Sequence, residues 1–202
     1  MVSQDGYSKY QERLSSPFDP FKFEIKVLNG YWTMTETGRR VKSTFEESLP
    51  QIPSGRILDL GCSIGMTTEE IASLYPSCNV YGIDMNPRAL EIARERVNVP
   101  EIEFILGDGF RKPFPAEHFD GIFCMNNLGF TFNPGNPQTF KRHLDNILSM
   151  VRQEGYLLFA GGLCTVAVMQ KTGNGQKIKS LLVGEHENEQ YMAQFLLDSY
   201  QK

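Results

Sequence analysis

The sequence predicts an α/β fold with a doubly wound, mostly parallel sheet, flanking helices and an N-terminal cap. Three observations lead to this class: short apolar runs recur between residues 56 and 160, helical patterns separate them, and the aromatic first 50 residues share neither pattern. Runs that are apolar throughout are typical of strands covered on both faces. Alternating strands and helices imply right-handed crossovers, with ligands bound at the carboxyl ends of the strands.

Five parallel strands are expected, each at an apolar run bounded by turn or helix signals: residues 56–60, 79–84, 103–107, 119–125 and 155–160. The clearest helix between them begins with Asn86 as N-cap and Pro87 at the first helical position. A later helix carries apolar residues at offsets 0, 4, 7, 8 and 11, which share one face: Phe140, Leu144, Ile147, Leu148 and Val151.

The chain divides into a cap or lid segment over residues 1–50 and a ligand-binding domain over residues 51–202. The last part of this domain contains a turn at Thr172–Gly175 and a modest amphipathic helix over Gln190–Tyr200. Residues 161–202 do not offer two convincing strand runs. We therefore expect a far edge of the sheet that is shortened, rearranged or completed by a second copy of the chain in a homo-oligomer.

Composition excludes several classes of partner. Twenty Lys and Arg against 24 Asp and Glu give a net charge of −4 without long blocks of either sign, so neither nucleic acid nor a membrane is an expected partner. The polar N-terminus lacks the features of a signal peptide, and no window approaches 18 apolar residues, which together predict a cytoplasmic protein. No metal site is expected, because the cysteines lie far apart: Cys62, Cys78, Cys124 and Cys164.

A turn containing glycine follows the first predicted strand and carries the chemistry. Gly61 and Gly65 let the main chain lie against a ligand, and the N–H groups at the start of the next helix favour a negatively charged group. Thr67, with Glu70 three residues later, marks that start as a capping box. Asp84 ends the second strand, where a carboxylate can accept hydrogen bonds from both hydroxyls of a ribose. These features predict a nucleoside-cofactor site.

The spacing within the turn indicates which cofactor. A dinucleotide site has G-x-G-x-x-G, whereas here Gly61 and Gly65 are four residues apart and Asp59 precedes the first by two. This D-x-G-x-x-x-G pattern, with Asp84 closing the second strand and Gly107-Asp108 closing the third, resembles the class I S-adenosylmethionine-dependent methyltransferases. The most similar branch is the small-molecule one that includes the ubiquinone and menaquinone biosynthesis methyltransferases. The resemblance covers about half the chain and implies a Rossmann-like fold, S-adenosyl-L-methionine as cofactor and methyltransferase activity for residues 51–202.

The resemblance also implies a role for each matching residue. The methionine part of the cofactor would be held by the turn, namely by Asp59, Gly61, Cys62, Ser63 and Gly65. Asp84 would bind the ribose and Met85 would pack on adenine. The edge and face of adenine would be read by Asp108, Gly109 and Phe110, and Asn126 would meet the methionine end. Ser63 stands where the family has a second glycine and adds a hydroxyl that could reach the cofactor.

A sulfonium methyl group is already activated, so positioning of the acceptor matters more than a strong base. If the acceptor is a hydroxyl or a carbon acid, a general base is needed within hydrogen-bond reach of its proton. His143 is the candidate, because it lies early in the helix after the fourth strand, on the ligand side. His118 precedes the fourth strand, on the side away from the cofactor, and His186 sits in a charged surface run.

A small organic acceptor is expected to contact aromatic and amide side chains near the methyl group. These residues are Tyr10, Tyr31, Trp32, Asn127, Phe130 and Phe132. Flat or lipophilic small molecules would suit such a pocket, with the cap closing during turnover. The alternative is that the aromatic residues form the core of the cap and that the asparagines terminate a strand.

Three other functions remain open from the sequence. The acceptor could be a peptide or protein, admitted by the open stretch Asn133–Pro137. The chain could be a non-catalytic S-adenosylmethionine-binding partner subunit, because fold alone does not establish catalysis. A nucleotide-dependent oxidoreductase is disfavoured by the turn spacing.

Overall fold

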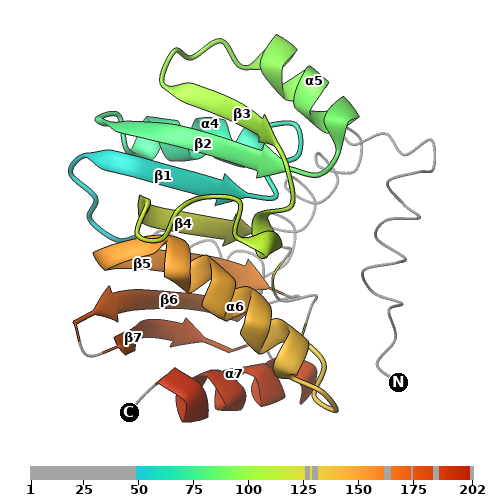
Figure 1. Ribbon diagram of the computed structural model, residues 1–202, viewed down its shortest axis with the longest axis vertical. Coiled ribbons are helices and arrows are strands. Elements are labelled where there is room, and N and C mark those ends of the chain that lie inside the picture. The colour runs from blue at the N-terminus through green and yellow to red at the C-terminus, as the bar shows by residue number, and fades with distance from the viewer. Residues whose placement is uncertain are drawn as a thin grey trace.

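One mixed sheet organises the molecule (Figure 1). The computed structural model describes residues 49–125, 128, 132–161, 165–173, 175–183 and 187–200, and within these ranges seven strands lie in the order β3-β2-β1-β4-β5-β6-β7. The first five are parallel: β1 (Gly55–Leu60), β2 (Cys78–Asp84), β3 (Ile102–Leu106), β4 (Phe119–Met125) and β5 (Val151–Gly161). The mostly parallel α/β fold is confirmed, while the predicted cap lies outside the described residues up to position 48.

Helices cover both faces of the sheet. One face is covered by α4 (Met66–Leu74), which packs against β1 and β2. Beside α4 on this face lies α5 (Pro87–Arg96). The other face carries the short 3₁₀ helix η1 (Gly109–Arg111), α6 (Gln138–Met150) and α7 (Glu187–Tyr200). The predicted cap of α5 is confirmed, because the Asn86 side chain accepts hydrogen bonds from the amides of Arg88 and Ala89.

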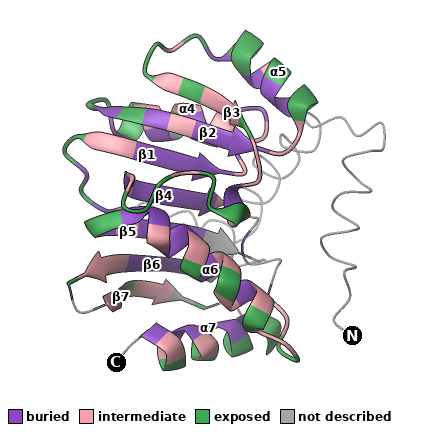
Figure 2. Cartoon of the chain, viewed as in Figure 1, coloured by how far each residue is buried: buried purple, intermediate pink, exposed green. Residues whose placement is uncertain are grey.

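Alternation along the strands divides the core into two clusters. In β1, Leu58 and Leu60 face the cluster under α6 and α7, whereas Ile57 faces the cluster under α4. The central strands are therefore buried over most of their length, as Figure 2 shows for β1 and β4. Because both faces are covered, these strands read as continuous apolar runs in the sequence.

The expectation that the sheet lacks a closing antiparallel pair is wrong. β6 (Thr165–Thr172) is antiparallel to β5, and β7 (Gly175–Leu182) is antiparallel to β6. Thr172 pairs with Gly175, so the predicted turn is the tip of a hairpin. β7 was missed because it is an edge strand in which Lys177 and Lys179 are exposed on either side of the buried Ile178.

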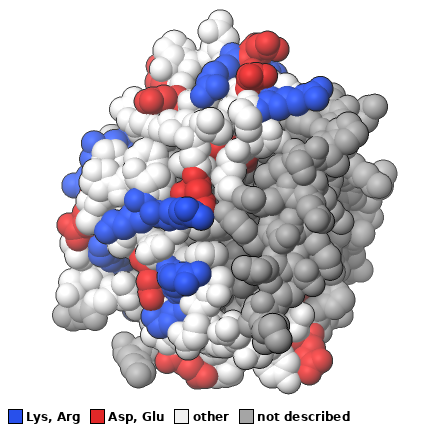
Figure 3. Space-filling view, turned by 45° about the vertical axis from the view of Figure 1, so that its right-hand side comes forward, with Lys and Arg blue, Asp and Glu red and all other residues white. Residues whose placement is uncertain are grey.

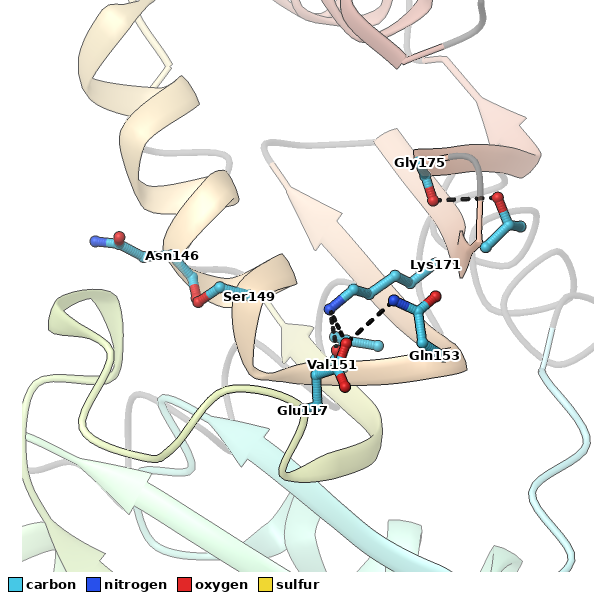
Figure 4. Close-up of polar contacts among 8 residues, drawn as sticks. Glu117, Asn146, Ser149, Val151, Gln153, Lys171 and Gly175 are labelled. Atoms are coloured by element: carbon cyan, nitrogen blue, oxygen red, sulfur yellow. Dashed lines mark hydrogen bonds and ion pairs between the residues drawn. The ribbon is translucent and has the colours of Figure 1, made fainter.

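At the amino ends of the parallel strands, polar contacts tie three segments together (Figure 4). The ammonium of Lys171 in β6 donates to the Val151 carbonyl at 2.8 Å and to the Glu117 carboxylate at 3.2 Å. Gln153 in β5 donates to the same carboxylate at 3.1 Å. These contacts at the amino ends of the strands are structural, and the candidate site lies at the opposite, carboxyl ends.

Elsewhere on the surface, side chains of opposite charge lie interspersed over the described part of the face in Figure 3. Among the described helices none has the length and apolar character needed to span a membrane.

Candidate functional site

The carboxyl ends of β1, β2 and β3 meet at one edge of the sheet and bring the predicted residues together. Leu60 pairs with Ile83, and Asp84 pairs with Leu106, so the three strands end at the same level. The segments that follow them carry the Gly61–Gly65 turn, Met85 and the Asp108–Phe110 loop. The sequence therefore predicted correctly which segments lie next to one another.

Three residues of the Gly61–Gly65 turn have backbone angles in the left-handed region. Gly61 and Gly65 both have φ of 80°, and Ser63 has φ of 48°. Gly65 is itself the N-cap of α4 and makes no side-chain cap, so the expected capping box of Thr67 with Glu70 is wrong. A Cβ at Gly65 would lie 2.6 Å from Cζ of Phe104, which means that packing beneath the turn also requires glycine there.

Most backbone amides of the turn donate hydrogen bonds to other groups of the protein. Gly61 and Cys62 donate to the Ile83 carbonyl at 2.8 and 3.1 Å, and Gly65 donates to the Cys62 carbonyl at 2.9 Å. Ser63 donates its amide to Oδ2 of Asp84 at 2.9 Å. A ligand on this turn therefore binds through groups other than these four amides.

Asp59 is a buried carboxyl group whose two oxygens differ. Oδ2 accepts hydrogen bonds from the hydroxyls of Thr67 at 2.8 Å and Thr68 at 2.7 Å, whereas Oδ1 has no partner among the described residues. Burial raises the pKa of Asp59 to about 6, against the lowering effect of the two hydroxyls. A buried oxygen without a donor is costly unless a ligand supplies one. Sequence reasoning interpreted Thr67 as a helix cap and assigned no role to Thr68.

Asp84 is held rigidly at the end of β2. Its Oδ2 accepts from the Ser63 amide, and its Oδ1 accepts from the Asn86 amide at 2.8 Å. Burial raises the pKa of Asp84, while the amides of Asn86, Ser63 and Met85 act in the opposite direction. The three amides fix the orientation of the carboxylate, and of its roughly four acceptor positions about one remains.

The loop after β3 is fixed by α6. Asp108 caps η1, with Oδ1 accepting from the Phe110 amide at 3.0 Å, and pairs with Arg111 at 3.1 Å. Asn146 of α6 donates to the Phe110 carbonyl at 2.9 Å. A Cβ at the buried Gly109 would lie 2.7 Å from Leu60 Cγ, so this loop sits directly against β1. Asn146 had no sequence signal, because its partner lies 36 residues away.

His143 lies beside this loop. Its imidazole stacks on the Phe110 ring, with centroids 4.7 Å apart and planes inclined by 10°. Nδ1 is buried and has no partner among the described residues. Burial lowers the pKa of His143, as does the charge of Arg142, while Asp108 opposes the shift. The imidazole is therefore neutral near pH 7, and its role as a general base stays a prediction.

The acceptor side of the site falls largely outside the described residues. This applies to Tyr10, Tyr31, Trp32, Asn126, Asn127 and Phe130, and also to His186. Phe132 is described and packs against Phe140 of α6 and Phe195 of α7, with centroids 5.3 and 6.0 Å apart. Its role as an acceptor contact stays a prediction.

Comparisons with known proteins agree on one family. A model described as a methyltransferase domain matches residues 57–155. A malonyl-[acyl-carrier protein] O-methyltransferase from Coxiella burnetii is 32% identical over 104 residues, covering 52% of this chain and 40% of that protein. A demethylmenaquinone methyltransferase from Renibacterium salmoninarum is 24% identical over 159 residues, covering 79% of this chain and 62% of that protein. The chain thus spans less than two thirds of the length of these curated relatives.

A solved structure supports the same fold. Phosphoethanolamine N-methyltransferase 2 from Haemonchus contortus, in complex with S-adenosyl-L-methionine, superposes with a TM-score of 0.55 at 18% identity. The match covers 74% of this chain and 35% of that one. At this identity the likeness concerns the arrangement of the sheet and helices.

Proposed function

Because the chain carries a domain of the class I S-adenosylmethionine-dependent methyltransferase family, we propose that it transfers a methyl group from S-adenosyl-L-methionine to a small organic acceptor. The acceptor atom is oxygen, nitrogen or carbon. The observation that carries the proposal is the meeting of Asp59, Asp84 and Asp108 at the carboxyl edge of three parallel strands.

The residues present fit this cofactor. Oδ1 of Asp59 accepts no hydrogen bond from any described residue and is suited to the ammonium of the methionine part, because a buried carboxylate is stabilised by a cationic donor. Asp84 has acceptor capacity left for a hydroxyl of the ribose. Met85 follows it and is half-buried, as suits a side chain packed on adenine. Asp108 and the amide of Gly109 are the proposed contacts to the adenine edge.

When bound, S-adenosyl-L-methionine would supply a methyl group attached to a positively charged sulfur, and this sulfur would become a neutral thioether as the methyl carbon passes to the acceptor. The protein's main task is to hold the acceptor in line with the methyl–sulfur bond, and such positioning contributes roughly 7–11 kcal/mol to lowering the barrier. For a hydroxyl or carbon acid the acceptor proton must pass to a base, for which His143 is the candidate.

Calorimetry tests the cofactor half of the proposal. We expect S-adenosylmethionine and S-adenosylhomocysteine to bind and NAD not to bind. Preferential binding of NAD would favour a nucleotide-dependent oxidoreductase and contradict the proposal.

Turnover tests the acceptor half. Radiolabelled methyl transfer should be measured against a panel of phenols, quinols, carboxylic acids, amines and peptides. We expect transfer to a small organic member of the panel. Transfer to peptides alone would identify a peptide methyltransferase, and cofactor binding without transfer to any member would support a non-catalytic partner subunit.

A further inference from the structure

Arg96, the last residue of α5, contacts the Gly61–Gly65 turn from the neighbouring crossover unit. Its Nε donates to the Ile64 carbonyl at 3.2 Å, and its Nη1 pairs with the Glu69 carboxylate in α4 at 2.8 Å. One planar guanidinium therefore spans the junction between the turn and the first turn of α4. Because 32 residues separate Arg96 from Ile64, this contact depends entirely on the tertiary fold.

The other end of α5 contacts the ribose side of the candidate site. Asn86 caps the helix and donates its own amide to Oδ1 of Asp84. The ten residues from Pro87 to Arg96 form a helix about 15 Å long. A single rigid element, seen beside β3 in Figure 1, thus touches Asp84 at one end and the turn at the other.

The surface beneath the turn completes the contact. A Cβ on Gly65 would lie 2.6 Å from Phe104 Cζ and 3.3 Å from Ala93 Cβ, so the turn rests directly on β3 and α5. Arg94, two residues before Arg96, donates to the Phe104 carbonyl at 2.8 Å and fixes α5 to β3. Packing limits movement of the turn toward the sheet, and Arg96 adds a directional hydrogen bond from α5 to the Ile64 carbonyl.

We propose that Arg96 is a positioning residue for cofactor binding: it holds the turn at the distance from Asp84 at which both contact one S-adenosylmethionine molecule. The proposal rests on the proposed function. Arg96 acts through the Ile64 carbonyl, on the half of the site that receives the amino-acid part of the cofactor. Its ion pair with Glu69 is partly exposed, with side-chain exposures of 29% and 46%, and by itself contributes little to stability.

The test compares two ligands that differ in the amino-acid part. S-adenosylhomocysteine has it, whereas 5′-methylthioadenosine lacks it. Calorimetry should give the Kd of both for the wild type, Arg96→Gln, Arg96→Lys and a control, Arg152→Gln. The control removes an ion pair of the same 2.8 Å length, to Asp120, at the opposite edge of the sheet.

We expect Arg96→Gln to raise the Kd of S-adenosylhomocysteine about tenfold and to leave that of 5′-methylthioadenosine within about twofold, because a charge-assisted hydrogen bond to the turn is lost. Arg96→Lys keeps one donor and should fall between the wild type and Arg96→Gln. Arg152→Gln should bind both ligands as the wild type does. The midpoint of thermal unfolding without ligand should be similar in all four proteins.

Unchanged affinity of Arg96→Gln for S-adenosylhomocysteine would overturn the proposal, as would an equal loss for both ligands. A lowered unfolding midpoint that accounts for the whole loss would do the same, because it would assign Arg96 a general structural role. Should the Gln variant not fold, the comparison of Arg96→Lys with Arg152→Gln decides by the same criteria. A wild-type protein that binds neither ligand contradicts the proposed function instead.

Discussion

Asp59 has only half of its hydrogen-bonding capacity satisfied within the described part of the protein. Two threonine hydroxyls donate to Oδ2, and Oδ1 lies buried with no donor among the residues that the structure describes. With its pKa raised to about 6, the carboxyl group is partly protonated just below neutral pH. A cationic ligand group beside Oδ1 would favour the ionised form and lower this pKa.

Binding of S-adenosylhomocysteine should consequently release protons near pH 6. Its affinity should decrease as the pH falls from 7 to 5, because more of Asp59 must then lose its proton before the ammonium binds. Asp59→Asn should weaken binding about tenfold or more at pH 7 and abolish this proton release. Calorimetry in buffers of different ionisation enthalpy measures both effects. Proton release that persists in Asp59→Asn would show that another group is responsible.

His143 can be tested by a pair of variants that separates packing from proton transfer. Phe can retain the stack on Phe110, whereas Ala removes it. With a hydroxyl or carbon-acid acceptor, we expect both variants to lose turnover about a hundredfold or more while they keep S-adenosylhomocysteine affinity. His143→Ala should in addition lose about 0.5–1.5 kcal/mol of stability with the aromatic contact. Full turnover in His143→Phe would contradict the general-base role and leave His143 a packing role only.

The same histidine gives a pH dependence of stability. Its folded-state pKa is lowered from the ordinary 6.5, so its contribution to stability is present above pH 6.5 and is lost as the pH falls through the folded-state value. Denaturant unfolding at pH 7.5 and pH 5.5 should show a smaller loss of stability in His143→Phe than in the wild type. Equal losses in the two proteins would contradict this assignment.

At the scale of elements, the Gly61–Gly65 turn depends on a residue without a side chain at its end. Gly65→Ala forces a Cβ toward Phe104 at a left-handed φ of 80°, so we expect a loss of about 1–3 kcal/mol of stability and weaker S-adenosylhomocysteine binding. Gly173→Ala is the matched control, because no heavy atom lies within 4 Å of its added Cβ. Chemical denaturation of both variants measures the difference. Equal stability would show that Phe104 relaxes freely.

The elements also show what the sequence could and could not predict. Strands β1 to β4 were found within one residue of their ends, because burial on both faces gives apolar runs that local reading detects. β7 was missed because Lys177 and Lys179 protect an exposed edge and weaken the apolar pattern. Thr67 was misread as a cap because its hydroxyl bonds Asp59, a contact that only the folded chain creates.

At the scale of the whole molecule, the C-terminal helix belongs to the main core. Leu196 of α7 is fully buried in the cluster that also contains Leu58 of β1 and Leu144 of α6. The hydroxyl of Tyr200 donates to Asp145 at 2.8 Å and links α7 to α6. The sheet and α7 should therefore unfold together.

Leu196→Ala should cost about 2–5 kcal/mol, and Leu197→Ala, at a half-buried neighbouring position, should cost less. Urea unfolding followed by far-ultraviolet and by near-ultraviolet circular dichroism measures both variants. The two probes should report one transition in each protein. Separate transitions, or a smaller effect at Leu196 than at Leu197, would show that α7 is only loosely attached.

The junction between α6 and β5 has no linker, since the helix ends at Met150 and the strand begins at Val151. Val151 pairs with Phe119 of β4, so a helix joined in this way cannot slide along its axis without shifting that pair. Asn146 and His143 are carried on that helix, so the loop they support stays in fixed alignment with the sheet. Extra residues inserted before α6 should therefore leave this alignment intact.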